Sequence, residues 1–87
     1  MDEGDTDYYQ VRSGSGPNLT VSLKNNSMTL RPNITAYDSQ KNQVFNEYRT
    51  TSGADLEKTF NTQPNSIYYV QVSPFAGSSG AYSLTIK

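Results

Sequence analysis

Four carboxylates stand at the start of the chain, and their spacing suits a hard cation. They are half of the eight acidic residues of this 87-residue chain: Asp2, Glu3, Asp5 and Asp7. Calcium takes about six to eight oxygen ligands, with backbone carbonyls and water completing the shell. Asp5 and Asp7 flank a single residue, so in a turn they could share one calcium ion, helped by Asp2 or Glu3. The alternative interpretation is a solvated acidic terminus that aids solubility.

Seven tyrosines supply most of the aromatic surface of a chain that has no tryptophan. An outward tyrosine on a sheet offers flat, amphipathic contact area at low entropic cost, which suits an extended peptide or a glycan. The alternative is that such side chains only pair across neighbouring strands. The candidate ligand-binding residues are Tyr69, Tyr37, Tyr48 and Gln71.

The composition lacks the residue types that most often carry out catalysis. The chain has no histidine and no cysteine, which removes the commonest general base and the thiolate nucleophile. None of the serines lies in a Gly-x-Ser-x-Gly elbow, and Gly14-Ser15-Gly16 joins two expected strands, so it cannot serve as a phosphate loop before a helix. We therefore expect no catalytic residues and no enzyme activity.

The charge and hydropathy of the chain argue against nucleic acid and membranes as partners. The net charge of −1 gives no global field that attracts nucleic acid, and the basic residues form no contiguous run. No apolar run approaches the roughly 18 residues of a transmembrane helix. The sequence predicts a monomer that neither binds nucleic acid nor inserts into a membrane.

The elements that must position these residues are strands. Ser, Thr and Asn supply 28 of the 87 residues, a composition that favours strands and turns over helices. Apolar residues recur at every second position, and turn residues separate the runs. Seven strands are expected, at 7–13, 18–24, 30–38, 43–49, 55–62, 67–73 and 81–87. Short strands at this spacing indicate an all-β fold, an antiparallel and jelly-roll-like β-sandwich.

The same alternation predicts which side chains face inward. The expected core is Tyr9, Val11, Leu19, Val21, Leu23, Ile34, Ala36, Phe60, Tyr68, Val70, Val72, Tyr82, Leu84 and Ile86. Tyr8, Tyr37 and Tyr69 then point outward. The orientation of Tyr48 stays open, because Val44 and Phe45 cannot both face inward. Pro32 is expected at an edge, a bulge or the start of its strand, since it has no amide proton to donate.

Five segments follow one another in an order that resembles a known family. They are Gly4-Asp5-Thr6-Asp7-Tyr8-Tyr9-Gln10-Val11, Asn18-Leu19-Thr20-Val21-Ser22-Leu23, Asn33-Ile34-Thr35-Ala36-Tyr37-Asp38, Ser66-Ile67-Tyr68-Tyr69-Val70-Gln71-Val72 and Gly80-Ala81-Tyr82-Ser83-Leu84-Thr85-Ile86. This order resembles the bacterial pre-peptidase C-terminal domain, a small sandwich related to the collagen-binding domains of clostridial collagenases. The chain departs from the family pattern at Asn65-Ser66-Ile67, where a glycine usually precedes the paired tyrosines.

The resemblance implies a single non-catalytic domain, 1–87, excised from a larger secreted bacterial protein, and most simply from a peptidase. It implies an extracellular or cell-surface location and a fibrous protein or peptide as partner, held by exposed aromatic residues of one sheet. Tyr69 lies in the motif Tyr68-Tyr69-Val70, which matches the family, so the resemblance implies a ligand-binding role for Tyr69 in particular. In the collagen-binding relatives, acids before paired aromatic residues hold calcium, and Asp7, ahead of Tyr8-Tyr9, matches that position best.

Two other functions remain open. One is a passive structural or spacer domain of a surface protein. The other is a carbohydrate-binding module, which the absence of tryptophan makes less favourable. Aid to export of the parent protein is a further role for the peptidase accessory domain. The identity of the neighbouring domains would separate these readings.

Overall fold

The computed structural model describes residues 6–74 and 80–87, and within them the chain forms seven strands and no helix. The strands are β1 (Asp7–Arg12), β2 (Asn18–Asn25), β3 (Pro32–Tyr37), β4 (Gln43–Tyr48), β5 (Leu56–Asn61), β6 (Ile67–Pro74) and β7 (Tyr82–Ile86). The seven predicted strands are confirmed, and each bound lies within two residues of the expected one. No helix in the described ranges is long and apolar enough to cross a membrane.

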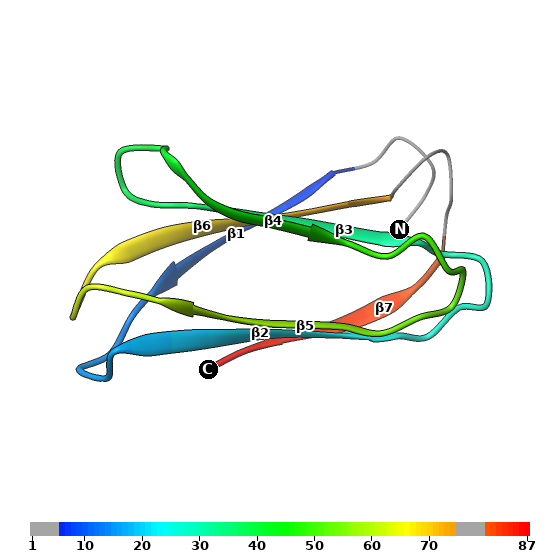
Figure 1. Cartoon of the computed structure of the whole chain (residues 1–87), viewed down its shortest axis with the longest axis horizontal. Helices are drawn as coiled ribbons and strands as arrows, with labels where there is room; N and C mark the ends of the chain where they lie inside the picture. Colours follow the sequence, from blue (N-terminus) through cyan, green and yellow to red (C-terminus); the bar gives the residue numbers. More distant parts are fainter. Residues whose placement is uncertain (1–5, 75–79) are drawn as a thin grey trace.

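The strands form two antiparallel sheets that face each other as a sandwich (Figure 1). One sheet has the order β1-β6-β3-β4 and the other β5-β2-β7. Only β3 and β4 are consecutive strands of one sheet; every other connection passes from one sheet to the other. The central strands β6, β3 and β2 are therefore covered on their inner side by the opposite sheet.

The core lies between the central strands. Its most deeply buried members are Val21, Leu23, Ile34, Val70 and Val72, each at most 2% exposed. The expected core is confirmed for these strands. It is only partly right for the edge strands β1 and β7, where five expected core residues are half-buried: Tyr9, Val11, Tyr82, Leu84 and Ile86. An edge strand has a neighbour on one side only, so its inward side chains keep contact with water.

Two buried leucines were missing from the expected core. Leu56 begins β5 and is 1% exposed, and Leu30 is fully buried although it precedes β3. The amide of Gly53 donates to the Leu30 carbonyl at 2.9 Å, which ties the segment before β3 to the turn before β5. The strand itself starts at Pro32, as expected for a residue that cannot donate to the ladder.

Three aromatic rings fill the space near β4 and β5. The ring centroids of Phe45 and Phe60 are 5.2 Å apart, and those of Phe60 and Tyr68 are 5.6 Å apart in an edge-on arrangement. Phe45 therefore faces inward, while Val44 is 38% exposed on the other side. This contact decides the orientation of β4 that alternation left open.

The turn before β6 contains a residue with a left-handed backbone conformation. Asn65 has a φ of 52°, in the left-handed region that glycine favours and that asparagine adopts more readily than most residues. The Asn65 amide donates to the Gly14 carbonyl at 3.1 Å. β6 follows this turn, and its alternation places Tyr68 and Tyr69 on opposite faces of the sheet.

Replacing Tyr68 with alanine tests the core assignment. Tyr68 is 5% exposed, contacts Phe60, and its hydroxyl accepts a hydrogen bond from the Gln63 amide at 2.8 Å. We expect Tyr68→Ala to lower the free energy of unfolding by about 3–5 kcal/mol, as other large aromatic truncations do. Denaturant unfolding measures this loss.

If Tyr68→Ala does not fold, Tyr68→Phe keeps the test open. It removes only the hydroxyl that the Gln63 amide donates to, so a loss of about 1 kcal/mol is expected. Tyr69→Ala, on the outer side of the same strand, should cost less than Tyr68→Ala. Equal losses for Tyr68→Ala and Tyr69→Ala would contradict the assignment of faces.

Candidate functional site

The outer face of the four-stranded sheet brings three tyrosines together. In the register of the sheet, Tyr69 lies opposite Tyr37 of β3, and Gln71 lies opposite Tyr8 of β1. Alternation places all four side chains on the side of the sheet that faces away from β2, β5 and β7. Residues opposite or diagonal to one another on one face are within reach of aromatic side chains. The four therefore form one cluster.

This cluster lines an open cleft of about 450 Å³, completed by Lys41. Tyr8 is 68% exposed at its margin. The Tyr37 hydroxyl donates to Gln71 Oε1 at 3.2 Å, which orients both side chains along the floor. We call the five lining residues the tyrosine cleft: Tyr8, Tyr37, Lys41, Tyr69 and Gln71.

Lys41 reaches the tyrosine cleft because of the tight turn between β3 and β4. The Asp38 carboxylate accepts hydrogen bonds from the amides of Gln40 and Asn42, both at 2.9 Å. The Lys41 amide donates to the Asp38 carbonyl at 2.9 Å, and Lys41 itself has a φ of 66°. This capped turn holds a cationic side chain at the end of an aromatic surface.

Sequence reasoning found three of the five cleft residues. Tyr37, Tyr69 and Gln71 were expected to bind ligand, and the structure brings them together. Tyr8 was recognised only as outward-facing. Lys41 was missed. Asp38 could have indicated it, because aspartate commonly caps a tight turn of the kind that positions Lys41.

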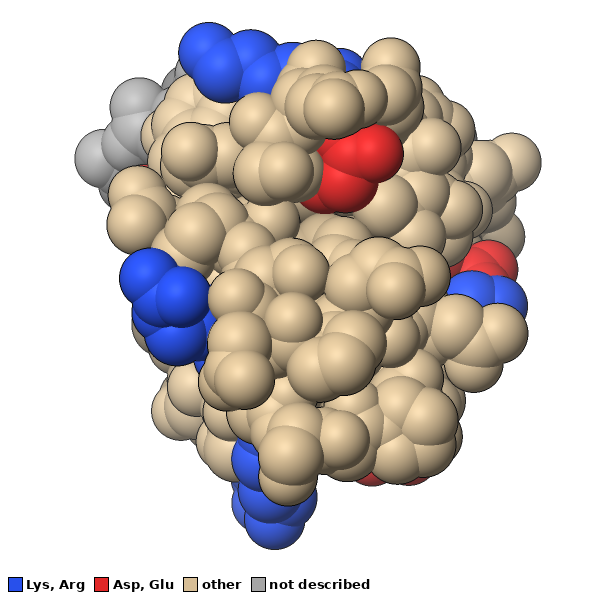
Figure 2. Space-filling view, turned by 90° about the vertical axis from the view of Figure 1, so that its left-hand side faces the viewer, with Lys and Arg blue, Asp and Glu red and all other residues tan. Residues whose placement is uncertain are grey.

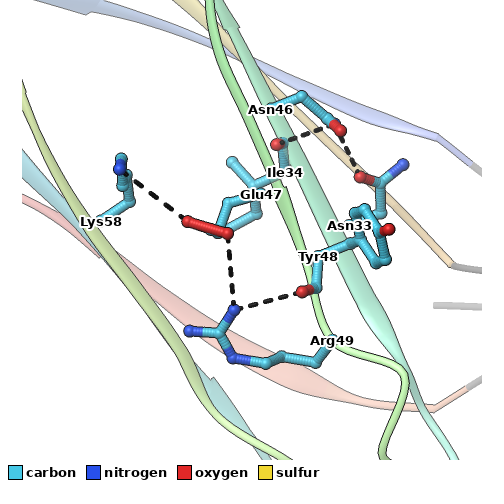
Figure 3. A network of polar contacts seen from close by, with 7 residues as sticks. All are labelled: Asn33, Ile34, Asn46, Glu47, Tyr48, Arg49 and Lys58. Carbon is cyan, nitrogen blue, oxygen red and sulfur yellow. Dashed lines mark hydrogen bonds and ion pairs between the residues drawn. The ribbon is translucent and has the colours of Figure 1, made fainter.

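Tyr48 does not line the tyrosine cleft. It shares the outer face but pairs with Asn33 at the other end of β3, so the pair of Thr35 and Asn46 lies between it and Tyr37. That intervening surface is polar. Asn46 donates to Asn33 Oδ1 at 2.9 Å (Figure 3), and it also donates to Thr35 Oγ1 at 2.8 Å. Tyr48 is 46% exposed, as a separate aromatic side chain.

A charged group closes the open side between β4 and β5. Glu47 of β4 pairs with Lys58 of β5 at 3.9 Å and with Arg49 at 3.8 Å, and Arg49 also donates to the Tyr48 carbonyl at 3.1 Å (Figure 3). Each of these side chains keeps more than a third of its surface exposed, so each pair contributes at most about 1 kcal/mol. The group closes this edge of the sandwich.

The expected calcium ligands fall mostly outside the described residues. Asp2, Glu3 and Asp5 lie in 1–5, and only Asp7 is described. Asp7 Oδ2 accepts a hydrogen bond from the Tyr82 hydroxyl at 2.5 Å. No group of three or more metal-ligating His, Cys, Asp or Glu side chains is found within 6–74 and 80–87.

Asp7, Tyr82 and Tyr9 link the two sheets along the β1 and β7 side. The Tyr82 hydroxyl lies 2.7 Å from the Tyr9 hydroxyl, so donation to Asp7 leaves Tyr82 as acceptor from Tyr9. Burial, and then the hydrogen bonds with Asp7 and Tyr9, raise the pKa of Tyr82 well above its usual range. Ionised Tyr82 would be desolvated beside a carboxylate, which explains the direction.

The other hollows formed by residues 6–74 and 80–87 contain no aromatic side chain. On the outer face of β2, β5 and β7 a second hollow is lined by hydroxyl and charged side chains, where Ser22 donates to Glu57 at 2.9 Å. Figure 2 shows one end of the molecule, and there the Lys and Arg side chains are separated by uncharged surface. The tyrosine cleft is thus the best candidate for a ligand site among the described residues.

No protein-family model and no curated protein matches this chain. The structure of infectious bursal disease virus Gx strain shares 15% identity over 97% of this chain and 29% of the viral chain, with a TM-score of 0.33. A mutant VP2 protein of infectious bursal disease virus, in derived T=1 particles, shares 13% identity over 98% of this chain and 31% of its own, with a TM-score of 0.35. This chain spans less than a third of either viral chain, and a likeness this distant supports no statement about function.

Removing the Tyr82 hydroxyl tests the link between the sheets. Tyr82→Phe should cost about 1 kcal/mol at neutral pH, the usual contribution of one hydrogen bond. The pKa of Tyr82 is raised in the folded state. The contribution of Tyr82 to the free energy of unfolding is therefore present below about pH 10, the pKa of an unperturbed tyrosine, and is lost as the pH rises above that value. Denaturant unfolding at neutral and alkaline pH measures both effects.

The variant supplies its own control, because phenylalanine does not titrate. Above pH 10 the free energy of unfolding of the unchanged protein should fall more steeply than that of Tyr82→Phe. Parallel pH profiles would show that the contact with Asp7 does not hold in solution.

Proposed function

We propose that this chain is a non-catalytic binding module of a secreted bacterial protein, and that it tethers its parent protein to a fibrous protein or peptide. The observation that carries the proposal is the tyrosine cleft, in which Tyr8, Tyr37 and Tyr69 share one exposed surface with Lys41 and Gln71. Aromatic side chains of this kind dominate the energy of many binding interfaces.

The chemistry of the tyrosine cleft suits an extended polypeptide. Tyrosine rings bury apolar or proline-like side chains while their hydroxyls remain hydrogen-bonded. Lys41 adds donors and a positive charge for carbonyl or carboxylate oxygens of the ligand. Because the lining residues come from β1, β6, β3 and the turn after β3, a ligand that crosses the strands can contact all of them.

The resemblance to the pre-peptidase C-terminal domain supports the choice of parent protein. Tyr68 and Tyr69, the paired tyrosines of that resemblance, lie on β6 with one side chain buried and the other on the outer face. A secreted bacterial peptidase with an extracellular or cell-surface location is the parent protein proposed on this basis. Assistance with export is compatible with the same accessory role.

A glycan is the second candidate ligand. Tyrosine faces flanked by amide and ammonium donors are also the groups that hold sugar rings and their hydroxyls. The tyrosine cleft offers both, in Tyr69 beside Gln71 and Lys41. A spacer domain, in contrast, would leave such a surface without a ligand, and the binding experiment distinguishes the three functions.

Calcium is proposed as a ligand of the acidic start of the chain, with Asp7 as one carboxylate. Asp7 Oδ2 already accepts from Tyr82, and a carboxylate oxygen has more than one lone pair to offer. Bound there, calcium would supply a positive charge that neutralises the acidic start and ties it to β1.

Replacing Tyr69 tests the tether. Tyr69→Ala should weaken binding to collagen or denatured protein by about 1–3 kcal/mol, or roughly 5- to 150-fold, as truncation of an aromatic anchor commonly does. A pulldown against collagen, denatured protein and insoluble polysaccharide measures the retained fraction. Retention by polysaccharide alone would favour the glycan.

Tyr48→Ala is the matched control. It removes an exposed tyrosine from the same face but outside the tyrosine cleft, so binding should persist. Circular dichroism of each variant checks that folding is intact. If no polymer retains the unchanged protein, the chain acts as a spacer. If Tyr69→Ala binds as well as the unchanged protein, the tyrosine cleft is not the ligand site.

Adding calcium tests the metal. Millimolar calcium should raise the melting temperature, because an ion that binds only the folded state stabilises it by mass action. Asp7→Asn should remove that gain. Tyr82→Phe is the control, since it lowers stability at the same contact but leaves the carboxylate in place.

The melting curves are measured on this chain and on a version extended upstream by its natural sequence. An unchanged melting temperature in both would remove the calcium hypothesis. A calcium gain that persists in Asp7→Asn would assign the ion to other oxygens.

A further inference from the structure

The outer edge of β7 has backbone groups that pair with nothing among the described residues. Thr20 and Lys87 exchange both backbone hydrogen bonds, at 2.7 and 3.0 Å, and the Asn26 amide donates to the Ala81 carbonyl at 3.0 Å. In an antiparallel pair such residues alternate along the strand. The backbone groups of Tyr82, Leu84 and Ile86 therefore point away from β2. Within residues 6–74 and 80–87, β7 pairs with β2 and with no other strand, so these backbone groups form a free edge there.

The opposite side of the sandwich carries devices that discourage strand addition. Lys58 shares a face with the buried Phe60, and Glu47 shares a face with Phe45, so both charges lie on the inward side of edge strands. The register also shifts between Ala36 and its neighbour Tyr37, as in a β-bulge. Inward charges and bulges are common means of blocking edge-to-edge pairing.

β7 has none of these devices. Its sequence, Tyr-Ser-Leu-Thr-Ile, contains no charged residue and no proline. Its three inward side chains are all half-buried: Tyr82, Leu84 and Ile86. A neutral strand with a free backbone edge and incompletely covered apolar side chains is a template for another strand.

We propose that β7 pairs antiparallel with β7 of a second copy of this chain, which joins the two three-stranded sheets into one. This replaces the monomer expected from the sequence. The contact is isologous, because a two-fold axis relates the two strands.

The register of the free edge favours a second copy as the occupant. Centring the axis on Leu84 pairs its amide and carbonyl with those of Leu84 in the second copy, and pairs Tyr82 with Ile86. All three residues are those whose backbone groups face the free edge. An axis perpendicular to the sheet keeps the apolar sides of both strands on one face, so Leu84 packs against its own copy.

The outer face of the same pairing is electrostatically neutral. Ser83 lies opposite Thr85 of the second copy, so no like charges meet across the axis. β1, the edge strand on the same side of the sandwich, carries Asp7 and Arg12, and Asp7 is already engaged with Tyr82. β7 is therefore the edge whose own sequence is complementary to itself.

Charge substitutions at Ser83 and Thr85 test the pairing without touching the core. Both side chains are exposed. Ser83→Glu combined with Thr85→Glu brings like charges opposite each other twice, and should weaken self-association by about tenfold. Ser83→Glu combined with Thr85→Lys creates opposite charges at the same points and should retain the dimer. Position 83 lies opposite Lys24 of β2. Both variants carry Ser83→Glu, so this contact within one chain is the same in the two.

Sedimentation equilibrium over a wide concentration range gives the mass. The unchanged chain should show a doubled mass that falls to that of one chain on dilution. Amide hydrogen exchange should show concentration-dependent protection of Leu84 and Ile86, and none of Gln10 on β1. A single-chain mass at millimolar protein, equal behaviour of the two variants, or protection of Gln10 instead would overturn the proposal. Protection of Leu84 only after addition of an unrelated peptide would do so too, and would assign the edge to that peptide.

Discussion

The inner faces of the three central strands are the contact on which the rest of the structure depends. Val21 of β2, Ile34 of β3, and Val70 and Val72 of β6 are completely buried between the sheets. A chain this short buries only roughly 60–65% of the surface that its unfolded form exposes. One layer of branched side chains must therefore hold both sheets together, and the flanking strands depend on it.

The two open sides of the sandwich are closed by different chemistry. At β4 and β5, Phe45 packs on Phe60 beneath the exposed pair of Glu47 and Lys58. At β1 and β7, Tyr82 joins Asp7 through its hydroxyl, while the aliphatic side chains of β7 stay half-buried. One side is thus covered by aromatic packing and guarded by charge. The other relies on a hydrogen bond and leaves a strand edge free.

The tyrosine cleft depends on the pairing register of three strands. β6 buries Tyr68 and presents Tyr69, and its neighbours β1 and β3 add Tyr8 and Tyr37 by register. A hydrogen bond orients Tyr37 and Gln71. The turn capped by Asp38 positions Lys41 at the margin of the cleft. Side chains whose positions are set by strand pairing would lose little conformational freedom if a ligand bound there.

Alternation by itself determined the all-β class, the strand positions and the inward side of the central strands, because a side-chain period of two is a local property of extended backbone. The sequence also pointed to Tyr37, Tyr69 and Gln71. Only the tertiary structure decided that Phe45 and not Val44 faces inward, that Tyr8 and Lys41 complete the cleft, and that Tyr48 stands apart. These features depend on which strands are neighbours and in what register, and strand pairing joins residues far apart in the chain, where local periodicity carries no information.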